Sequence, residues 1–157
     1  MSPRRNRCIL EHMRLFLCLL LPALFLFAQA SDQKDVIAVV QKTFDGIAAH
    51  DGEMIRAAML PDAKIYLVRE NGAASSSTLQ EMAAQISGSK VEMLERFTSA
   101  PQVLVRGRIA QVWGEYEFLR EGKFSHCGVD TATLFKTADG WKIATLSYTV
   151  ERSGCKQ

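Results

Sequence analysis

The 157-residue chain is long enough for one domain and too short for two domains of ordinary size. Its formal charge is +2, but four arginines and Glu11 lie within the first 30 residues, so the remainder is close to neutral. The other basic residues are scattered, and Arg106 and Arg108 stand apart from them. A nucleic-acid partner is therefore not expected, because such a partner needs a basic patch or stripe.

The first 30 residues have the pattern of a secretory signal peptide. Arginines precede an apolar run over residues 15–27, and Ala28, Gln29 and Ala30 follow as a small-x-small cleavage site. A membrane anchor is the alternative, but a span needs roughly 20 apolar residues. We predict a signal peptide over residues 1–30, export to the periplasm or the medium, and no stable membrane span. Whether Met1 or Met13 is the true start stays open.

Two cysteines, Cys127 and Cys155, remain once residues 1–30 are removed. In an exported chain two cysteines are more often paired than free, so we predict a disulfide between the middle of one strand and the tail. The alternative is a buried free thiol at Cys127. No other Cys or His pair has zinc-binding spacing, so neither a metal site nor a cofactor is predicted.

Three helices are expected before and between the first strands. Over residues 32–49 an apolar stripe recurs at helical spacing, and Ser31 and Asp32 can cap its start; the stripe consists of Val36, Val40, Phe44 and Ile47. A short helix follows Asp51, with Met54 and Ala58 facing inward, and Pro61 ends it. Residues 78–81 (TLQE) have the capping-box pattern and begin a third helix that ends near residue 88.

The rest of the chain is expected to be extended. Residues 64–69 (KIYLVR) indicate a strand, residues 70–77 a polar surface loop, and residues 91–105 an extended stretch interrupted near Pro101. Residues 108–150 indicate a three-stranded antiparallel meander, rich in β-branched and aromatic residues, with turns at Glu121-Gly122 and Asp139-Gly140. This order predicts an α+β fold in which the helices pack on a strongly curved antiparallel sheet.

Three segments resemble the nuclear-transport-factor-2-like (SnoaL-like) superfamily, in a secreted bacterial branch often labelled lumazine-binding-like or of unknown function. They are residues 107–114 (GRIAQVWG), 124–130 (FSHCGVD) and 140–143 (GWKI), and the resemblance covers residues 34–155. It implies a single cone-shaped domain over residues 31–157, a pocket between sheet and helices, and frequently a homodimer. The superfamily contains isomerases, dehydratases, cyclases and binding modules, so the fold alone does not supply a function.

Four polar side chains of the meander are expected on one face of the sheet. With three-residue loops at both turns, Tyr116 would lie opposite His126 and Tyr148 opposite Asp130, among apolar neighbours. An apolar surface with a few convergent polar groups is typical of a small-molecule pocket. Tyr66 is a further candidate that would reach the pocket from its far wall.

Asp130 is the candidate general base, because burial against aromatic walls would raise its pKa. The alternative is that Asp130 accepts a hydrogen bond from Tyr148 in a structural network. His126 lies about 13 Å along the strand from Asp130, too far for a His–Asp pair.

Three functions follow as hypotheses. The first is the binding of an unknown, mostly apolar or aromatic small molecule. The second is a hydratase, isomerase or cyclase that uses Asp130 as base. The third is a dimeric interaction module that uses the outer sheet face, where Trp113, Glu115 and Glu117 are expected.

Overall fold

The computed structural model describes residues 31–155, so the predicted signal peptide lies outside the described residues. This part of the chain has the expected α+β architecture, with three helices and seven strands. The helices are a first helix over residues 31–48, α2 (Gly52–Ala58) and α3 (Leu79–Gly88). The strands are β1 (Met59–Arg69), β2 (Ala74–Thr78), β3 (Met93–Phe97), β4 (Gln102–Arg106), β5 (Ile109–Arg120), β6 (Lys123–Thr137) and β7 (Gly140–Val150). No helix within residues 31–155 is both long and apolar enough to cross a membrane.

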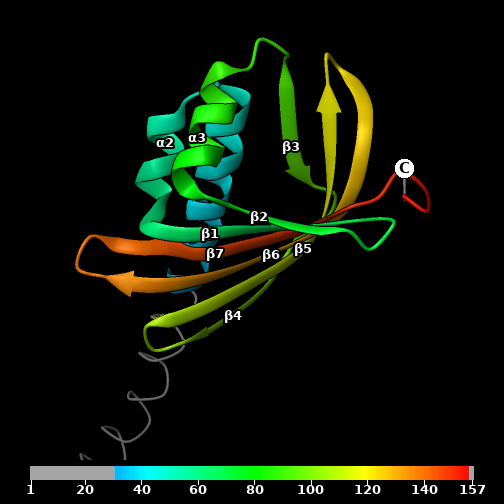
Figure 1. The fold of residues 1–157 in the computed structure, drawn as a ribbon. Coiled ribbons are helices and arrows are strands. Elements are labelled where there is room, and N and C mark those ends of the chain that lie inside the picture. Colours follow the sequence, from blue (N-terminus) through cyan, green and yellow to red (C-terminus); the bar gives the residue numbers. More distant parts are fainter. Residues whose placement is uncertain (1–30, 156–157) are drawn as a thin grey trace, which may run out of the picture.

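The seven strands form one curved sheet in the order β2-β1-β7-β6-β5-β3, and β4 also pairs with β5. Every pairing is antiparallel except that of β1 with β7, which is parallel. The helices lie on one face of the sheet, and the joined ends of β5 and β6 bend toward that side together with β3 (Figure 1). The inner face of the sheet is therefore partly enclosed.

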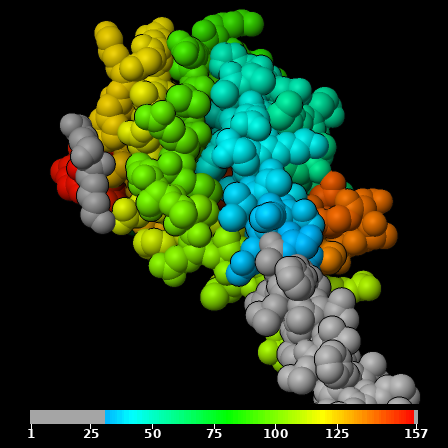
Figure 2. Space-filling model, turned by 180° about the vertical axis from the view of Figure 1, so that it is seen from behind, coloured from blue at the N-terminus to red at the C-terminus, as the bar shows by residue number. Residues whose placement is uncertain are grey.

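The first helix buries its predicted stripe against the inner face. Val36, Val40, Phe44 and Ile47 are all at most 4% exposed. Seen from behind, the helix lies between the yellow-green segment that contains β3 and β4 and the orange β6–β7 turn (Figure 2). The ring of Phe44 meets that of Phe97 on β3 edge-on, with 5.0 Å between the ring centres. This contact joins the helix to the far end of the sheet.

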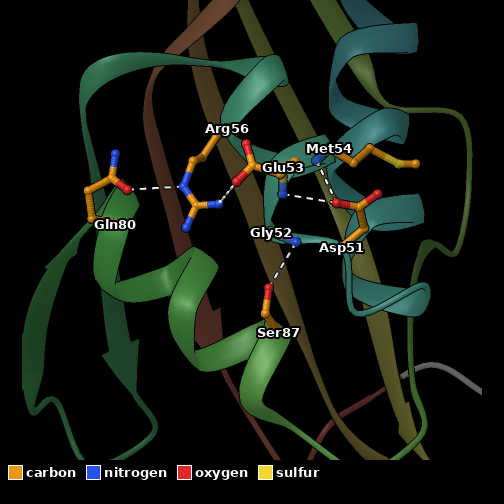
Figure 3. A network of polar contacts seen from close by, with 7 residues as sticks. All are labelled: Asp51, Gly52, Glu53, Met54, Arg56, Gln80 and Ser87. Carbon is orange, nitrogen blue, oxygen red and sulfur yellow. Dashed lines mark hydrogen bonds and ion pairs between the residues drawn. The ribbon is translucent and has the colours of Figure 1, made fainter.

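The two short helices are fixed by caps and by contacts with each other (Figure 3). Asp51 accepts hydrogen bonds from the backbone N–H groups of Glu53 and Met54, both at 2.9 Å, and so caps α2. The N–H of Gly52 donates to the Ser87 hydroxyl on α3 at 3.0 Å. The predicted capping box at the start of α3 is confirmed between Thr78 and Glu81.

Several local expectations need correction. Residues 74–78 form β2 rather than a loop, because Asn71 and Gly72 close a hairpin with β1, and Gly72 has φ 78°. β1 begins at Met59 and runs through Pro61, where its register with β7 is irregular. In α2 the buried residues are Gly52, Ile55 and Ala58, so Ala58 faces inward as expected, whereas Met54 is only partly buried.

The start of the first helix also differs from the expectation. Ser31 and Asp32 are already helical, so they are not the predicted caps. The carboxylate of Asp32 instead pairs with Lys136 at 2.5 Å and accepts a hydrogen bond from the Trp141 indole at 3.2 Å. Asp32 thus attaches the helix to the β6–β7 hairpin.

Both hairpins of the meander have shorter loops than predicted. Arg120 pairs with Lys123, and the two residues between them have φ values of 50° and 70°. These are the positive angles of a two-residue type I′ turn. At the other turn Thr137 pairs with Gly140, which again leaves two residues between the strands. Each hairpin also contains one register shift, between Phe118 and Leu119 and between Thr133 and Leu134.

The predicted disulfide is present between Cys127 and Cys155, 28 residues apart. It attaches the tail to the middle of β6. Cys127 and Glu151 also exchange backbone hydrogen bonds, both at 2.9 Å. The chain after β7 is thereby held beside the strand that carries His126 and Asp130.

Candidate functional site

Six polar and aromatic side chains gather where the inner face of the sheet bends, and we call them the inner cluster. They come from four strands: Glu95 on β3, Tyr116 and Phe118 on β5, His126 and Asp130 on β6, and Tyr148 on β7. Asp130 and Tyr116 are buried, and the other four are partly exposed. Four of the six side chains thus keep some contact with solvent.

The register places four of the predicted residues on one face, although not with all the predicted partners. Asp130 lies opposite Tyr148, as expected. Tyr116 lies opposite Gly128 and not opposite His126, whose partner is Phe118. The shorter turn and the register shift together displace the pairing by two residues, and side chains alternate with a period of two. The face is consequently preserved while the partner changes.

Asp130 is the most constrained member of the cluster. It is 2% exposed, and no hydrogen-bond donor within residues 31–155 reaches either of its carboxylate oxygens. The expected hydrogen bond from Tyr148 is thus not formed. Among residues 31–155 the carboxyl of Glu95 can hydrogen-bond with that of Asp130, but only when one of the two carries a proton.

Burial and mutual repulsion decide where that proton resides. Burial raises the pKa of Asp130 well above its ordinary value, and the nearby charge of Glu95 raises it further. Burial also raises the pKa of Glu95 to about 7, an effect that its hydrogen bond with Asp130 partly offsets. Near neutral pH the two carboxyls therefore share a proton and titrate as a coupled pair.

The aromatic members surround this pair and stay uncharged. The Tyr116 hydroxyl donates to the Thr149 carbonyl at 2.7 Å, and burial raises its pKa. Burial raises the pKa of Tyr148 as well, and the charges of Glu95 and Asp130 raise it further by smaller amounts. The pKa of His126 is lowered, chiefly by burial, so its ring is neutral at pH 7. That ring stacks on Phe118 with 4.8 Å between the ring centres.

Two glycines allow the strands to approach each other at the bend. Gly114 lies opposite Asp130, and a Cβ there would be 2.5 Å from the ring of Phe97. Gly128 lies opposite Tyr116, and a Cβ there would be 2.2 Å from the Thr149 carbonyl oxygen. A glycine inside a strand commonly marks such a close approach. The missing side chains leave room for the Phe97 ring beside Gly114 and for the Thr149 backbone beside Gly128.

The structure does not bring Tyr66 to the inner cluster. Tyr66 is 46% exposed and points outward, because the inner positions of β1 on either side of it belong to Ile65 and Leu67. Glu95, by contrast, is a member that the sequence prediction missed. The available signal was its position between Met93 and Phe97, which alternate with it on the inward face of a short strand.

The outer face of the sheet carries Trp113 and Glu117, as expected. Glu117 pairs with Arg96 at 2.6 Å. Trp113 belongs to an exposed apolar patch, which we call the outer patch and which consists of Leu104, Ile109, Trp113 and Phe135. Leu104 is the most exposed of these residues, at 72%.

Several hollows lie near these two surfaces. The largest described hollow, of about 520 Å³, lies between Gln33 of the first helix and the β4–β5 hairpin, away from Asp130. A smaller one, of about 100 Å³, has Tyr116, Gly128 and Cys155 in its wall. No group of three or more His, Cys, Asp or Glu side chains suited to a metal ion occurs within residues 31–155.

Residues 31–149 match the family described as "Putative lumazine-binding". The chain belongs to this family. Comparison with curated proteins finds no match. The family assignment agrees with the nuclear-transport-factor-2-like resemblance of the sequence.

Solved structures show the same fold at low sequence identity. A nuclear transport factor 2-like superfamily protein from Salmonella enterica is 12% identical, with a TM-score of 0.65 over 81% of this chain and 96% of that one. A protein from Novosphingobium aromaticivorans with a cystatin-like fold is 13% identical, with a TM-score of 0.62 over 98% and 94%. A protein from Streptomyces avermitilis, described as a putative dehydratase, is 19% identical, with a TM-score of 0.60 over 78% and 97%. At these identities the likeness establishes the fold alone.

The carboxyl pair should make the free energy of unfolding depend on pH. Because folding raises both pKa values, the folded state holds more protons than the unfolded state between about pH 4 and pH 7. The pair's contribution is therefore fully present in acid, and the part that comes from Glu95 is lost as the pH rises through about 7. Each extra bound proton makes the free energy of unfolding fall by about 1.4 kcal/mol per pH unit. We expect Asp130→Asn to flatten this fall in urea titrations between pH 5 and pH 8.

Glu117→Gln is the matched control, because Glu117 lies on the outer face and pairs with Arg96. That variant should keep the slope of the unmodified protein. Identical slopes for the Asp130→Asn variant and the unmodified protein would show that the carboxyl pair is not linked to folding in this way.

Proposed function

We propose that the protein is an exported small-molecule-binding protein, and that its ligand lies against the inner cluster. The observation that carries this proposal is Asp130, whose carboxyl is buried and finds no hydrogen-bond donor within residues 31–155 apart from a proton shared with Glu95. A buried polar group without a partner costs roughly 1–3 kcal/mol, and more when the group is charged. A ligand that supplied a donor would recover part of that cost. Export rests on the sequence of residues 1–30 and agrees with the Cys127–Cys155 disulfide.

The remaining cluster residues suit a flat and mostly apolar molecule. Phe118 and His126 offer a stacked pair of rings, while Tyr148 and Glu95 keep part of their surface accessible. The family description suggests a lumazine, which is a bicyclic heteroaromatic ring with adjacent N–H and C=O groups. Such groups could hydrogen-bond with a carboxyl pair that holds one proton, because the pair offers both an acceptor and a donor.

The test is a titration of the purified protein with lumazine and a panel of smaller aromatic fragments, followed by amide NMR. We expect bound probes to shift the signals of Tyr116, His126 and Tyr148, and a Phe118→Ala variant to weaken binding by about 10-fold. A Trp113→Ala variant on the outer face is the control and should bind normally. Shifts confined to other surfaces, or no binding by any member of the panel, would contradict the proposal.

A second candidate function is acid–base catalysis of the hydratase, isomerase or cyclase type. The observation that favours it is the raised pKa of both Asp130 and Glu95, since a carboxyl poised near neutral pH can accept or donate a proton efficiently. In this reaction class Asp130 or Glu95 would remove a proton from carbon or oxygen. Tyr148 or His126 would orient the substrate oxygen.

If the protein is an enzyme, Asp130→Asn should lower turnover by about 10²-fold or more, while the melting temperature in acid, where Asp130 is protonated and uncharged, stays nearly unchanged. The readout is product formation measured by NMR on any substrate that the binding screen supplies. A variant that retains turnover, or that mainly loses stability, would assign Asp130 a structural role instead.

We also propose that the protein forms a homodimer through the outer patch, whose four large apolar residues are exposed on neighbouring strands. The expected result is a particle of twice the chain mass in sedimentation equilibrium, and Leu104→Asp should convert it to a monomer. Ala110→Ser is the control, because Ala110 lies beside Ile109 on β5 but faces inward. This variant leaves the outer patch unchanged and should stay dimeric. A monomeric unmodified protein at micromolar concentration would contradict the dimer.

A further inference from the structure

The inner cluster has acidic groups without a compensating cation. Glu95 and Asp130 supply two carboxyls, and the other titratable members, Tyr116, His126 and Tyr148, are neutral near pH 7. The first helix presents the buried apolar side chains of its predicted stripe to the sheet. Once Glu95 loses its proton, the described part of the cluster therefore carries a net negative charge.

The nearby basic side chains act elsewhere. Arg96 follows Glu95 on β3, but it points to the outer face and pairs with Glu117 at 2.6 Å. The charges of Arg120 and Arg152 add to the effect of burial in lowering the pKa of His126. The charge of Arg69 acts on Tyr148, where it opposes the larger effect of burial on the pKa. Within residues 31–155 no lysine, arginine or histidine forms an ion pair with Glu95 or Asp130. The carboxyl pair therefore has no protein counter-charge among the described residues.

The surroundings of the pair favour an organic cation over a metal ion. A metal site needs several oxygen, nitrogen or sulfur ligands, and no group of three suitable side chains occurs within residues 31–155. The charges of the pair act instead on the hydroxyls of Tyr116 and Tyr148, whose rings contact each other. The Tyr116 ring also contacts His126, which stacks on Phe118. Aromatic faces attract cations, and they do so most strongly where water is excluded.

We propose that the inner cluster selects organic cations, that is protonated amines, amidines or guanidines attached to an apolar or aromatic body. This inference rests on the proposed small-molecule function and specifies the class of ligand. Glu95 and Asp130 would accept the N–H groups of the cation, and the aromatic rings would contact its body. As the cation binds, the proton shared by the two carboxyls leaves to the buffer.

The experiment compares three probes of nearly the same shape, namely benzamidine, benzamide and benzoate, by isothermal titration calorimetry with the purified protein. At pH 8 we expect benzamidine to bind at least about 10-fold more tightly than benzamide, and benzoate not to bind. Toward pH 5.5 the preference should shrink, because Glu95, whose pKa is about 7, takes up a proton. Titrations in buffers of different ionisation enthalpy should show proton release when benzamidine binds.

Variants assign the preference to the carboxyl pair. Glu95→Gln should reduce the benzamidine-to-benzamide ratio to about 1, whereas Glu117→Gln on the outer face should leave it unchanged. If Glu95→Gln fails to fold, Asp130→Asn serves the same purpose. A ratio that survives either carboxyl substitution in a folded variant would overturn the proposal.

Amide NMR separates failure of this inference from failure of the proposed function. Equal binding of benzamide and benzamidine, with shifts at Tyr116, His126 and Tyr148, would overturn the cation preference but keep the small-molecule function. Absence of binding by all three probes and by the lumazine panel would overturn both. Benzamidine shifts confined to the outer face would also overturn the cation site.

Discussion

The curvature of the sheet at β5 and β6 is the constraint on which the candidate site depends. β3 pairs with β5, and β5 pairs with β6, so on a flat sheet the whole of β5 would separate Glu95 from Asp130. The bend turns β3 toward the helices (Figure 1), so that the Glu95 side chain reaches across the inner face to Asp130. Gly114 and Gly128 permit this shape, because a Cβ at either position would approach a ring or a carbonyl oxygen within 2.5 Å. The same curvature brings Phe97 against Phe44 and so connects the site to the first helix.

The site is costly for the fold, and the surrounding contacts act against that cost. The largely apolar environment disfavours ionisation of the two carboxyls. The free-energy cost of keeping them buried therefore grows as the pH rises. The Thr149 hydroxyl accepts from the N–H of Val129 at 3.0 Å and donates to Glu151 at 3.0 Å, which holds the end of β7 beside β6. The disulfide between Cys127 and Cys155 fixes the tail to the same part of β6. A binding site that retains unpaired polar atoms needs this kind of rigid support, because the strands would otherwise relax to satisfy them.

Much of the fold could be predicted because its signals are local. The stripe of the first helix, the capping box of α3 and the three-stranded meander each depend on residues close together in the chain. Loop length and register were less accessible. Both turns were expected to have three residues, and each has two, yet a register shift in each hairpin returned the strands to the expected face. The predicted face of Tyr116 and His126 is therefore correct although their predicted pairing is wrong, because a displacement of two residues leaves the alternation of side chains unchanged.

The Glu95–Asp130 contact could not be predicted, because it joins residues that are neither local in sequence nor adjacent in the sheet. Asp130 was identified from its own strand, whereas Glu95 acquires its role only through the bend. The same pair of carboxyls underlies both proposed functions, ligand binding and acid–base catalysis. Two carboxyls that share one proton can receive a cation by releasing that proton, or they can transfer it to a bound molecule. The chemistry of the ligand then decides the outcome: a ligand that brings its own positive charge displaces the proton, whereas a neutral ligand with an acidic C–H or a basic oxygen exchanges a proton with the pair.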